Sequence, residues 1–478
     1  MSAQEQVVVE DQACEFALQL KKQQQAYLAN PMPSADERIA RLKRLRKSLL
    51  AHQDELIESL NKDFGRRSPE ETLLLDVLPN INNIDYCVKR LKKWMKTETR
   101  HTDLLVRPAK VELMYQPVGV VGIIGAWNGP IIVTFGPLVT ALAAGNSAMI
   151  KMSEFNPETN KVAKKIIAEA FDDSLVSIFD GEAEASARFS ALPFNHLMFT
   201  GSTAVGRHVM RAASANLVPV TLELGGKCPV IVCPDMDIDD AVSRFIYGKC
   251  ANSGQICLSP DYILCPEGKE QAVVDAYCKL FKEMFPAFSS PTDHSSVHSE
   301  RHFQRLQEIL SDAKAKGATV ISANGQEPDP KTRMMPTHLV LNATEDMIVM
   351  QEEIFGPILP IKGYKSVEEA VSYINQGGRP LGLYIMSFDK TTQDYILNHT
   401  HSGGVSINEV VSHALCDDVP FGGVGDSGIG HYHGHEGFKA MSKAKTVLKR
   451  GKFYPGKFTA PPYDKGFLRP ILKWLLRQ

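Results

Sequence analysis

Two short segments carry side chains that could together perform covalent catalysis on a carbonyl group. The segment NSGQIC ends at Cys257, and the segment ELGGK begins at Glu223. A thiol can attack a carbonyl carbon, and a carboxylate can later activate the water that hydrolyses the acyl-enzyme. Small residues beside each group let a backbone approach a ligand closely. The pair therefore indicates a sulfur nucleophile with a hydrolytic base.

Each of these two residues also has an ordinary structural interpretation. A single cysteine is usually inert unless positive groups or amide donors lower its pKa. Glu223 lies in the strand-like run 218–224, where apolar residues alternate with Thr221 and Glu223. Ligands gather at the carboxyl ends of strands in open α/β sheets, so this position suits acid–base chemistry. A surface glutamate would fit the same alternation.

Two further segments follow strand-like runs and bear groups that could hold a nucleotide. Residues 201–206 open a helix after the run 196–200, and backbone amides there could face a phosphate. Their Gly-x-x-x-x-Gly spacing differs from the usual dinucleotide fingerprint and is a weak signal. Lys151 and Glu154 could grip ribose hydroxyls or a phosphate, or they could form a surface ion pair worth about 0–1 kcal/mol.

An asparagine and an acidic–aromatic pair complete the candidate groups. Asn128 follows Trp127 after a long apolar run, and its amide could donate a hydrogen bond to an oxyanion. The ordinary alternative is a turn-forming asparagine before Gly129. Glu353 precedes Phe355 by two residues, which could bind a sugar and pack against a flat ring.

The composition of the chain is that of a water-soluble globular protein. Its 478 residues are enough for two or three domains, and 44% are hydrophobic. The formal charge of −2 gives no long-range attraction to nucleic acid or to an anionic membrane. The N-terminus lacks a secretory signal, and no run reaches the roughly 18 to 20 apolar residues of a membrane span. Nine scattered cysteines without a Cys-x-x-Cys pair argue against a zinc site and favour the reducing cytoplasm.

Hydrophobic periodicity predicts an α/β fold with two units. Residues 35–60 and 70–96 have the spacing of amphipathic helices. From 118 to 251 strand-like runs alternate with helical ones, and the same rhythm returns between 337 and 387. This βαβ order predicts doubly wound parallel sheets.

Taken together, these segments resemble the aldehyde dehydrogenase superfamily over about residues 35–450. The order and spacing of the motifs agree, including PFGGVG at 420–425. The segment PDY after Cys257 and the segments GDSG and YHG near residue 430 are similar to the class 3 branch. Within that branch the chain is most similar to bacterial enzymes called coniferyl aldehyde dehydrogenases.

The resemblance implies a role for each candidate residue. Cys257 would attack the aldehyde, Asn128 and the amide of Cys257 would stabilise the oxyanion, and Glu223 would activate water. The residues implied to bind NAD or NADP, with NAD preferred, are Trp127, Lys151, Glu154, Gly201, Ser202, Gly206, Leu224, Glu353 and Phe355. Of these, Lys151 and Glu154 would hold the adenine-side ribose, residues 201–206 would adjoin the pyrophosphate, and Glu353 with Phe355 would hold the nicotinamide side. No metal is implied.

The resemblance also implies a domain plan and an aldehyde substrate. An NAD(P)-binding domain of Rossmann type would comprise 1–104 and 117–224, and a catalytic domain 225–430. A bridging arm at 105–116 and 431–455 would join two subunits into a homodimer, followed by a tail at 456–478. Many relatives carry a bulky aromatic residue where Gly129 stands and proline where Met152 stands. The missing ring would leave room for an aromatic aldehyde, such as coniferyl aldehyde, or a medium or long aliphatic one.

Three alternatives remain open at the level of the sequence. An acylating or reductase relative would pass the thioester to another acceptor, although Glu223 argues against this. A non-catalytic protein on the same fold is a further possibility. In the tail, residues 467–476 have helical amphipathic spacing with Pro470 in the first turn. That helix would dock on its own subunit or a partner, or it would make a peripheral membrane contact.

Overall fold

The structure is a computed structural model that describes residues 3–288, 293–464 and 466–476. Its contacts divide the chain into two compact units. The first unit comprises Met1–Trp94 and Pro117–Ser442, and the second comprises Met95–Gln116 and Lys443–Gln478. In the part of the chain that is described, no helix combines the length and apolar character needed to cross a bilayer.

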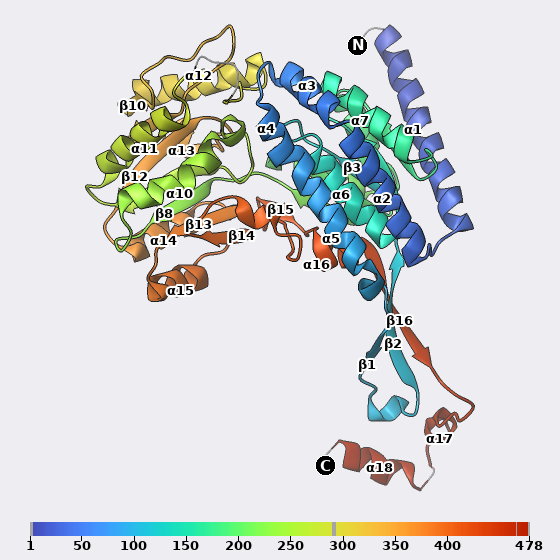
Figure 1. The fold of residues 1–478 in the computed structure, drawn as a ribbon. Coiled ribbons are helices and arrows are strands. Elements are labelled where there is room, and N and C mark those ends of the chain that lie inside the picture. The colour runs from blue at the N-terminus through green and yellow to red at the C-terminus, as the bar shows by residue number, and fades with distance from the viewer. Residues whose placement is uncertain (1–2, 289–292, 465, 477–478) are drawn as a thin grey trace. The chain divides into compact units, whose positions relative to one another are not determined.

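The first unit contains two sheets, and the earlier one in sequence is a six-stranded sheet (Figure 1). Its spatial order is β15-β7-β6-β3-β4-β5, with all neighbours parallel except β15, which is antiparallel to β7. The strands are β3 Val120–Ile124, β4 Ser147–Lys151, β5 Val176–Phe179, β6 His196–Thr200, β7 Val220–Glu223 and β15 Gly428–Ile429. Because five strands are parallel, their carboxyl ends meet at one edge, where ligands bind in such sheets.

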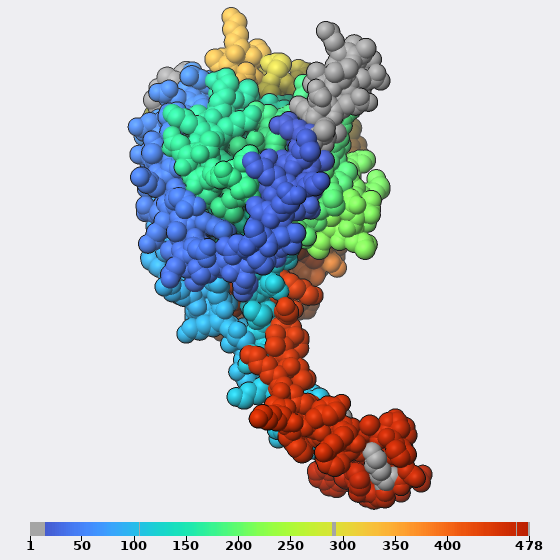
Figure 2. Space-filling model, turned by 90° about the vertical axis from the view of Figure 1, so that its right-hand side faces the viewer, coloured from blue at the N-terminus to red at the C-terminus, as the bar shows by residue number. Residues whose placement is uncertain are grey.

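Helices cover both faces of this sheet. One face is covered by α1, α8 and α9, and the other by α6 and α7, outside which α2, α3 and α5 pack. Figure 2 shows the C-terminal part of α1 at the surface of the unit, in dark blue. The bounds are α1 Ala3–Ala29, α2 Ala35–Ala51, α3 Gln53–Phe64, α4 Pro69–Thr72, a π-helix Leu73–Val77, α5 Leu78–Trp94, α6 Ile132–Ala144, α7 Pro157–Ala170, α8 Ala183–Ser190, α9 Thr203–Ser214 and α16 Gly434–Ala440. Side-chain caps fix several starts: Ser34 and Glu37 form a capping box on α2, and Ser202 caps α9.

The second sheet of this unit has seven strands in the order β10-β11-β12-β9-β8-β13-β14. Only β10 is antiparallel to its neighbour. The strands are β8 Cys228–Val232, β9 Pro260–Pro266, β10 Thr319–Ser322, β11 His338–Leu341, β12 Ile358–Tyr364, β13 Gly382–Met386 and β14 Gly404–Ile407. The surrounding helices are α10 Ile238–Cys250, α11 Glu270–Met284, α12 Glu300–Ala315, α13 Ile348–Gln351, α14 Val367–Gln376 and α15 Lys390–His399. Buried side chains of β8, β9, β12 and β13 form its core with α10 and α11.

The second unit is built on a three-stranded sheet with the order β1-β2-β16. Its strands are β1 Glu98–Arg100, β2 Lys110–Pro117 and β16 Ser442–Lys449, and two short helices follow, α17 Gly456–Thr459 and α18 Leu468–Leu475. Glu112 of β2 and Lys449 of β16 form an ion pair across the sheet, with 2.5 Å between Oε2 and Nζ.

The structure confirms the predicted α/β class with parallel sheets, and most of the predicted elements differ from it by one to three residues at their ends. The run 118–124 becomes β3, in which all five residues are buried. Pro470 lies in the first turn of α18, as predicted. Several elements were not predicted from the sequence, among them α1, β5, α8, β9, α11, α12, β10, α15 and β14.

Candidate active site

A cavity of about 820 Å³ opens at the carboxyl edge of the six-stranded sheet. The loops after β3, β4, β6 and β7 line one side, and residues before β9 and from α12 line the other. The predicted site residues that line it are Trp127, Asn128, Glu154, Gly201, Ser202, Glu223, Leu224, Cys257, Glu353 and Phe355. Residues far apart in the sequence therefore share one space.

Cys257 follows a short 3-10 turn, and the backbone of that turn has an uncommon conformation. Asn252, Ser253 and Gly254 have φ values of 48°, 57° and 70°, which is the left-handed region. A methyl group on Gly254 would approach the carbonyl oxygen of Gly356 to 2.7 Å, so glycine is required there. Such a turn is held by surrounding contacts, because non-glycine residues resist this conformation.

Gln255 supplies much of that support. Its side chain is fully buried and donates to the carbonyl oxygens of Asn252, at 2.8 Å, and Ser296, at 3.1 Å. Its Oε1 accepts from the amide of His298 at 2.8 Å. The glutamine two residues before Cys257, to which sequence analysis gave no role, anchors the loop of the nucleophile to residues 296–298.

The environment of Cys257 holds its side chain as a neutral thiol. Burial, together with the nearby carboxyls of Glu353 and Glu223, raises the pKa of Cys257 to about 12. A thiol is a much weaker nucleophile than a thiolate. The attack on a carbonyl therefore requires that the proton leave during the reaction.

Glu223 ends β7 and faces the cavity. The residue is 4% exposed, and neither carboxyl oxygen has a hydrogen-bond partner among the described residues. Burial raises its pKa well above the ordinary value. An unpartnered buried carboxyl that lines a cavity suits proton transfer to or from a ligand. The surface-glutamate interpretation is thus wrong.

Asn128 is fixed beside the Cys257 loop. Its Nδ2 donates to the carbonyl oxygen of Gln255 at 3.1 Å, and its own carbonyl accepts from Asn252 Nδ2 at 2.9 Å. The side chain is thereby held at the wall of the cavity that also contains Cys257. This position fits a donor to an oxyanion that forms at the thiol.

The segment 352–355 carries Glu353 and Phe355 and is clamped by three side chains. Lys227 Nζ donates to the carbonyl oxygens of Val349 and Glu352, both at 2.9 Å, and pairs with Asp261. Asp261 Oδ1 in turn accepts from the amide of Ile354 at 2.9 Å. From α12, Arg305 donates to the carbonyl oxygens of residues 353 and 354. The backbone of the segment is thus held from both sides.

The Glu353 carboxyl lies against Gly225, so close that a Cβ there would be 1.9 Å from Oε2. Burial and the neighbouring Asp261 raise the pKa of Glu353 to about 8. Phe355, at φ 50°, makes an edge contact with Trp127, with 5.4 Å between ring centroids. A carboxyl and flat rings at this end fit a ribose and an aromatic base.

The other end of the cavity contains Glu154 and the start of α9. Ser202 caps that helix, and backbone amides at such a start favour an anionic group. Two predicted residues do not line the cavity. Lys151 is 1% exposed and donates to the carbonyl of Met152 at 2.8 Å, while its Nζ lies 3.6 Å from Glu154 Oε2. Gly206 lies in α9, where a Cβ would meet Leu224 Cδ2 at 2.6 Å.

Sequence analysis missed the contribution of α12. Arg301, His302 and Arg305 line the same cavity, and His302 stacks on Trp127 with 4.5 Å between centroids. Cations and a helix start around one cavity suit a pyrophosphate, so the lining fits a dinucleotide. In the sequence, the sign of this contribution is that residues 301, 302 and 305 have the spacing of one helix face. That spacing does not show which segment of the chain the helix faces.

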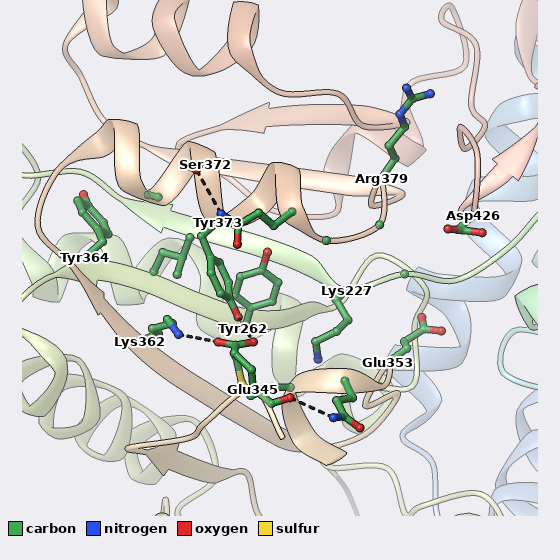
Figure 3. Close-up of a pocket in the computed structure, with 18 of the residues that line it drawn as sticks. Lys227, Tyr262, Glu345, Glu353, Lys362, Tyr364, Ser372, Tyr373, Arg379 and Asp426 are labelled. Carbon is green, nitrogen blue, oxygen red and sulfur yellow. Dashed lines mark hydrogen bonds and ion pairs between the residues drawn. The ribbon is translucent and has the colours of Figure 1, made fainter. Parts of the chain in front are cut away.

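A second cavity of about 880 Å³ lies beside the first and shares Gly225 and Glu353 with it. Figure 3 shows Lys227 and Glu353 at one end, and Tyr262 and Tyr373 near its centre. Its lysines already hold ion pairs, Lys227 with Asp261 and Lys362 with Glu345. Across the described chain, no three His, Cys, Asp or Glu side chains are grouped so that they could hold a metal ion.

Comparison with known proteins gives concordant results. Residues 9–447 match the model of the family described as "Aldehyde dehydrogenase family". A probable coniferyl aldehyde dehydrogenase of Pseudomonas aeruginosa is 47% identical over 95% of both chains. The substrate-bound AldH of Staphylococcus aureus has a TM-score of 0.91 at 34% identity, covering 96% of this chain and 99% of that one. A Mycobacterium tuberculosis aldehyde dehydrogenase complexed with NAD+ has a TM-score of 0.83 at 26% identity, covering 92% and 91%.

Proposed function

Because the chain belongs to the aldehyde dehydrogenase family and is an NAD(P)-dependent enzyme, we propose that its own Cys257, Glu223 and Asn128 oxidise an aldehyde to the carboxylic acid. The observation that carries this assignment is that all three line one cavity with Glu353 and Phe355. The nucleophile, the base and the oxyanion donor therefore share a space with groups suited to a nucleotide.

The first step joins the thiol to the aldehyde. Cys257 Sγ bonds to the carbonyl carbon as the thiol gives up its proton, and the carbonyl oxygen becomes the oxyanion of a thiohemiacetal. Asn128 Nδ2 and the amide of Cys257 stabilise that oxyanion. Glu223 is the nearby group that can accept the thiol proton, once its own carboxyl is ionised.

The later steps release the acid. When bound, NAD(P)+ supplies a hydride acceptor, so loss of hydride from the carbon leaves a thioester on Cys257. Glu223 first releases the thiol proton to solvent and then takes a proton from water; the resulting hydroxide adds to the thioester carbon, and the carbon–sulfur bond breaks. The leaving sulfur takes that second proton from Glu223, so the acid departs while the Cys257 thiol and the Glu223 carboxylate are restored. Low polarity around Glu223 favours this chemistry, since an unpartnered carboxylate is a stronger base than a solvated one.

Replacing the nucleophile tests this proposal directly. Cys257→Ala is expected to abolish aldehyde oxidation while leaving the affinity for the cofactor unchanged, because the thiol alone is removed. Cys278→Ala is the matched control, since Cys278 is also a free, partly exposed cysteine. Normal turnover by Cys257→Ala would remove this residue from the mechanism.

We propose that the substrate is a bulky aldehyde, either aromatic, such as coniferyl aldehyde, or medium to long aliphatic. Gly129 adjoins the oxyanion asparagine and has no side chain to narrow the approach. A Cβ on Gly129 would come within 2.8 Å of Ile132 Cγ2, so the present packing accommodates glycine there. The relative in P. aeruginosa that is named for coniferyl aldehyde supports the aromatic choice. Rates with coniferyl, benzyl and long aliphatic aldehydes would decide between them.

An acylating or reductase reaction is the alternative to hydrolysis. The buried carboxyl of Glu223 favours hydrolysis, because a base lies in the cavity with the thiol. Formation of free acid without any added acceptor would support the hydrolytic assignment. A requirement for a second acceptor would favour the alternative.

We propose that NAD is preferred over NADP. Glu154 lines the cavity, can accept a hydrogen bond from a free ribose 2′-hydroxyl and would repel a 2′-phosphate. The ammonium of Lys151, 3.6 Å from Glu154, offsets part of that repulsion, so NADP is still used. Glu154→Gln is expected to raise kcat/KM for NADP relative to NAD. An unchanged ratio would contradict this role.

We also propose a cytoplasmic homodimer joined through the arm at 105–116 and 431–455. The edges of a three-stranded sheet offer unpaired backbone groups to another strand. The mass in solution of the chain with and without residues 105–116 would test the arm.

The domain division at 224/225 is proposed because β7, with Glu223, belongs to the six-stranded sheet and β8 to the seven-stranded one.

A further inference from the structure

The C-terminal segment 456–476, which follows the proposed dimer arm, presents an apolar surface to solvent in the second unit. Figure 2 shows this segment in red. Its large apolar side chains are far more exposed than those of the core, with Trp474 at 72% and Tyr463 at 68% exposure. The other exposed members are Phe458, Phe467, Ile471, Leu472 and Leu476. Exposed apolar patches of this kind mark interaction sites.

The helix α18 separates apolar from basic residues around its axis. At 100° per residue, Phe467, Ile471 and Trp474 lie on one side of the apolar arc, and Leu472 and Leu476 extend it. The described polar positions, Arg469 and Lys473, fall on the opposite side. Leu468, 7% exposed, is the one residue of the helix that is buried. By the same count Leu468 and the half-buried Leu475 lie at the centre of the apolar arc, so the arc is covered at its centre and exposed on both flanks.

The charge of this segment indicates what covers that face. Residues 443–478 contain ten lysines and arginines and a single acidic residue, Asp464, although the whole chain has a net charge of −2. Such a concentration of positive charge complements an anionic surface. Basic residues beside Trp, Tyr and Phe side chains are the composition of segments that lie in the headgroup region of a bilayer.

We propose that α18 and the preceding aromatic segment form a docking surface for an anionic lipid bilayer. The exposed apolar side chains of α18 insert among the headgroups, and the basic side chains contact anionic lipids. The helix has eight residues, so it lies in the interface and does not span the bilayer. A face of this length is also small for a stable interface between two copies, which needs about 800 Å² from each partner.

Tryptophan fluorescence provides a direct probe. The chain has three tryptophans, of which Trp94 is buried and Trp127 lies in the active-site cavity, whereas Trp474 is exposed. The enzyme is expected to sediment together with vesicles of phosphatidylcholine that contain one third phosphatidylglycerol, and its tryptophan emission is expected to shift to the blue. Phosphatidylcholine alone should do neither. Trp474→Phe should keep the sedimentation and lose the shift.

Matched variants separate the apolar and electrostatic contributions. Ile471→Asp with Leu472→Asp is expected to reduce vesicle binding at least tenfold, and Lys473→Glu to reduce it by about fivefold or more. The control is Leu217→Asp, which changes an apolar side chain that is 90% exposed in the first unit and should leave binding unchanged. All variants should oxidise a small water-soluble aldehyde at the normal rate, which shows that they are folded.

Three results would overturn the proposal. The enzyme would fail to bind anionic vesicles, or it would bind them equally well after Ile471→Asp with Leu472→Asp. The third result is that the enzyme does not bind vesicles and that the same double change dissociates a dimer in vesicle-free solution. This face would then be a contact between two copies of the chain.

Discussion

Gly225→Ala should weaken use of the cofactor because it displaces the Glu353 carboxyl. A Cβ on Gly225 would lie 1.9 Å from Glu353 Oε2, whereas ordinary contact begins at 3.4 Å, so the oxygen must withdraw by about 1.5 Å. The φ angle of Gly225 is not positive, so the backbone itself accepts alanine. A misplacement of about 1 Å can cost 100-fold in rate, which corresponds to about 2.7 kcal/mol. We expect kcat/KM for NAD to fall by about this factor.

The neighbouring glycine is the control for this prediction. A Cβ on Gly226 would meet Leu381 N and Pro380 Cα at 3.4 Å, which is ordinary contact, so Gly226→Ala should change kcat/KM less than about threefold. The assay is the initial rate of cofactor reduction, with thermal unfolding measured in parallel. If Glu353→Ala is made first, Gly225→Ala should add little, because both changes act on one carboxyl. Full activity of Gly225→Ala, or equal losses in both glycine variants, would refute the reasoning.

Three further predictions follow from the buried ionisable groups. Glu223→Gln should give a first-turnover burst of reduced cofactor followed by a steady state slowed about 10²- to 10⁴-fold, since an amide cannot accept a proton from water; an unchanged steady-state rate would exclude Glu223 as the base. In the free enzyme with Cys416→Ser, which removes an exposed thiol, alkylation of Cys257 should accelerate up to at least pH 10, because its pKa is about 12; a plateau near pH 8 would contradict this. The pKa of Glu353 rises from 4.5 to about 8 on folding, so its contribution to stability is full below pH 4.5 and is lost as the pH rises through 8. The melting temperature of Glu353→Gln relative to the unaltered protein should therefore increase between pH 5 and pH 9, and parallel curves would show that Glu353 does not titrate in this way.

The sheet strands were predictable where both faces are buried. The runs that become β3, β4 and β6 are short and have continuous apolar centres, since parallel strands pack against helices on both sides. The polar groups placed after them could also be predicted, because parallel strands bring their carboxyl ends to one edge. β9 was not predicted because it begins with a proline directly after the Cys257 loop. Proline is uncommon in the interior of a sheet, so a run that starts with it does not look like a central strand.

The support of the site could not be read from the sequence in the same way. Gln255 holds residues 296–298, and Lys227 and Asp261 hold the backbone of 349–354. Each contact joins a side chain to the main chain of a distant segment, so no spacing in the sequence encodes it. The role of Lys151 at the ribose stays a prediction; its buried ammonium donates to the carbonyl of Met152 and lies 3.6 Å from Glu154, which lines the cavity. Local pattern finds residues at strand ends, but the fold decides which of them reach the cavity.

The protonation of the site connects this support to the chemistry. Burial raises the pKa of Cys257, Glu223 and Glu353 together, and the two carboxyls raise that of the thiol further. Burial disfavours the charged form of each group, and each negative charge that appears makes the next ionisation less favourable. In the free site the sulfur is thus kept as a thiol, which is poorly oxidised because oxidation follows thiolate character. Removing the proton from Cys257 requires Glu223 to be ionised and close, so the loop held by Gln255 and the strand β7 must keep the two side chains in one cavity. The same rigid contacts that position the nucleophile therefore also determine when it can react.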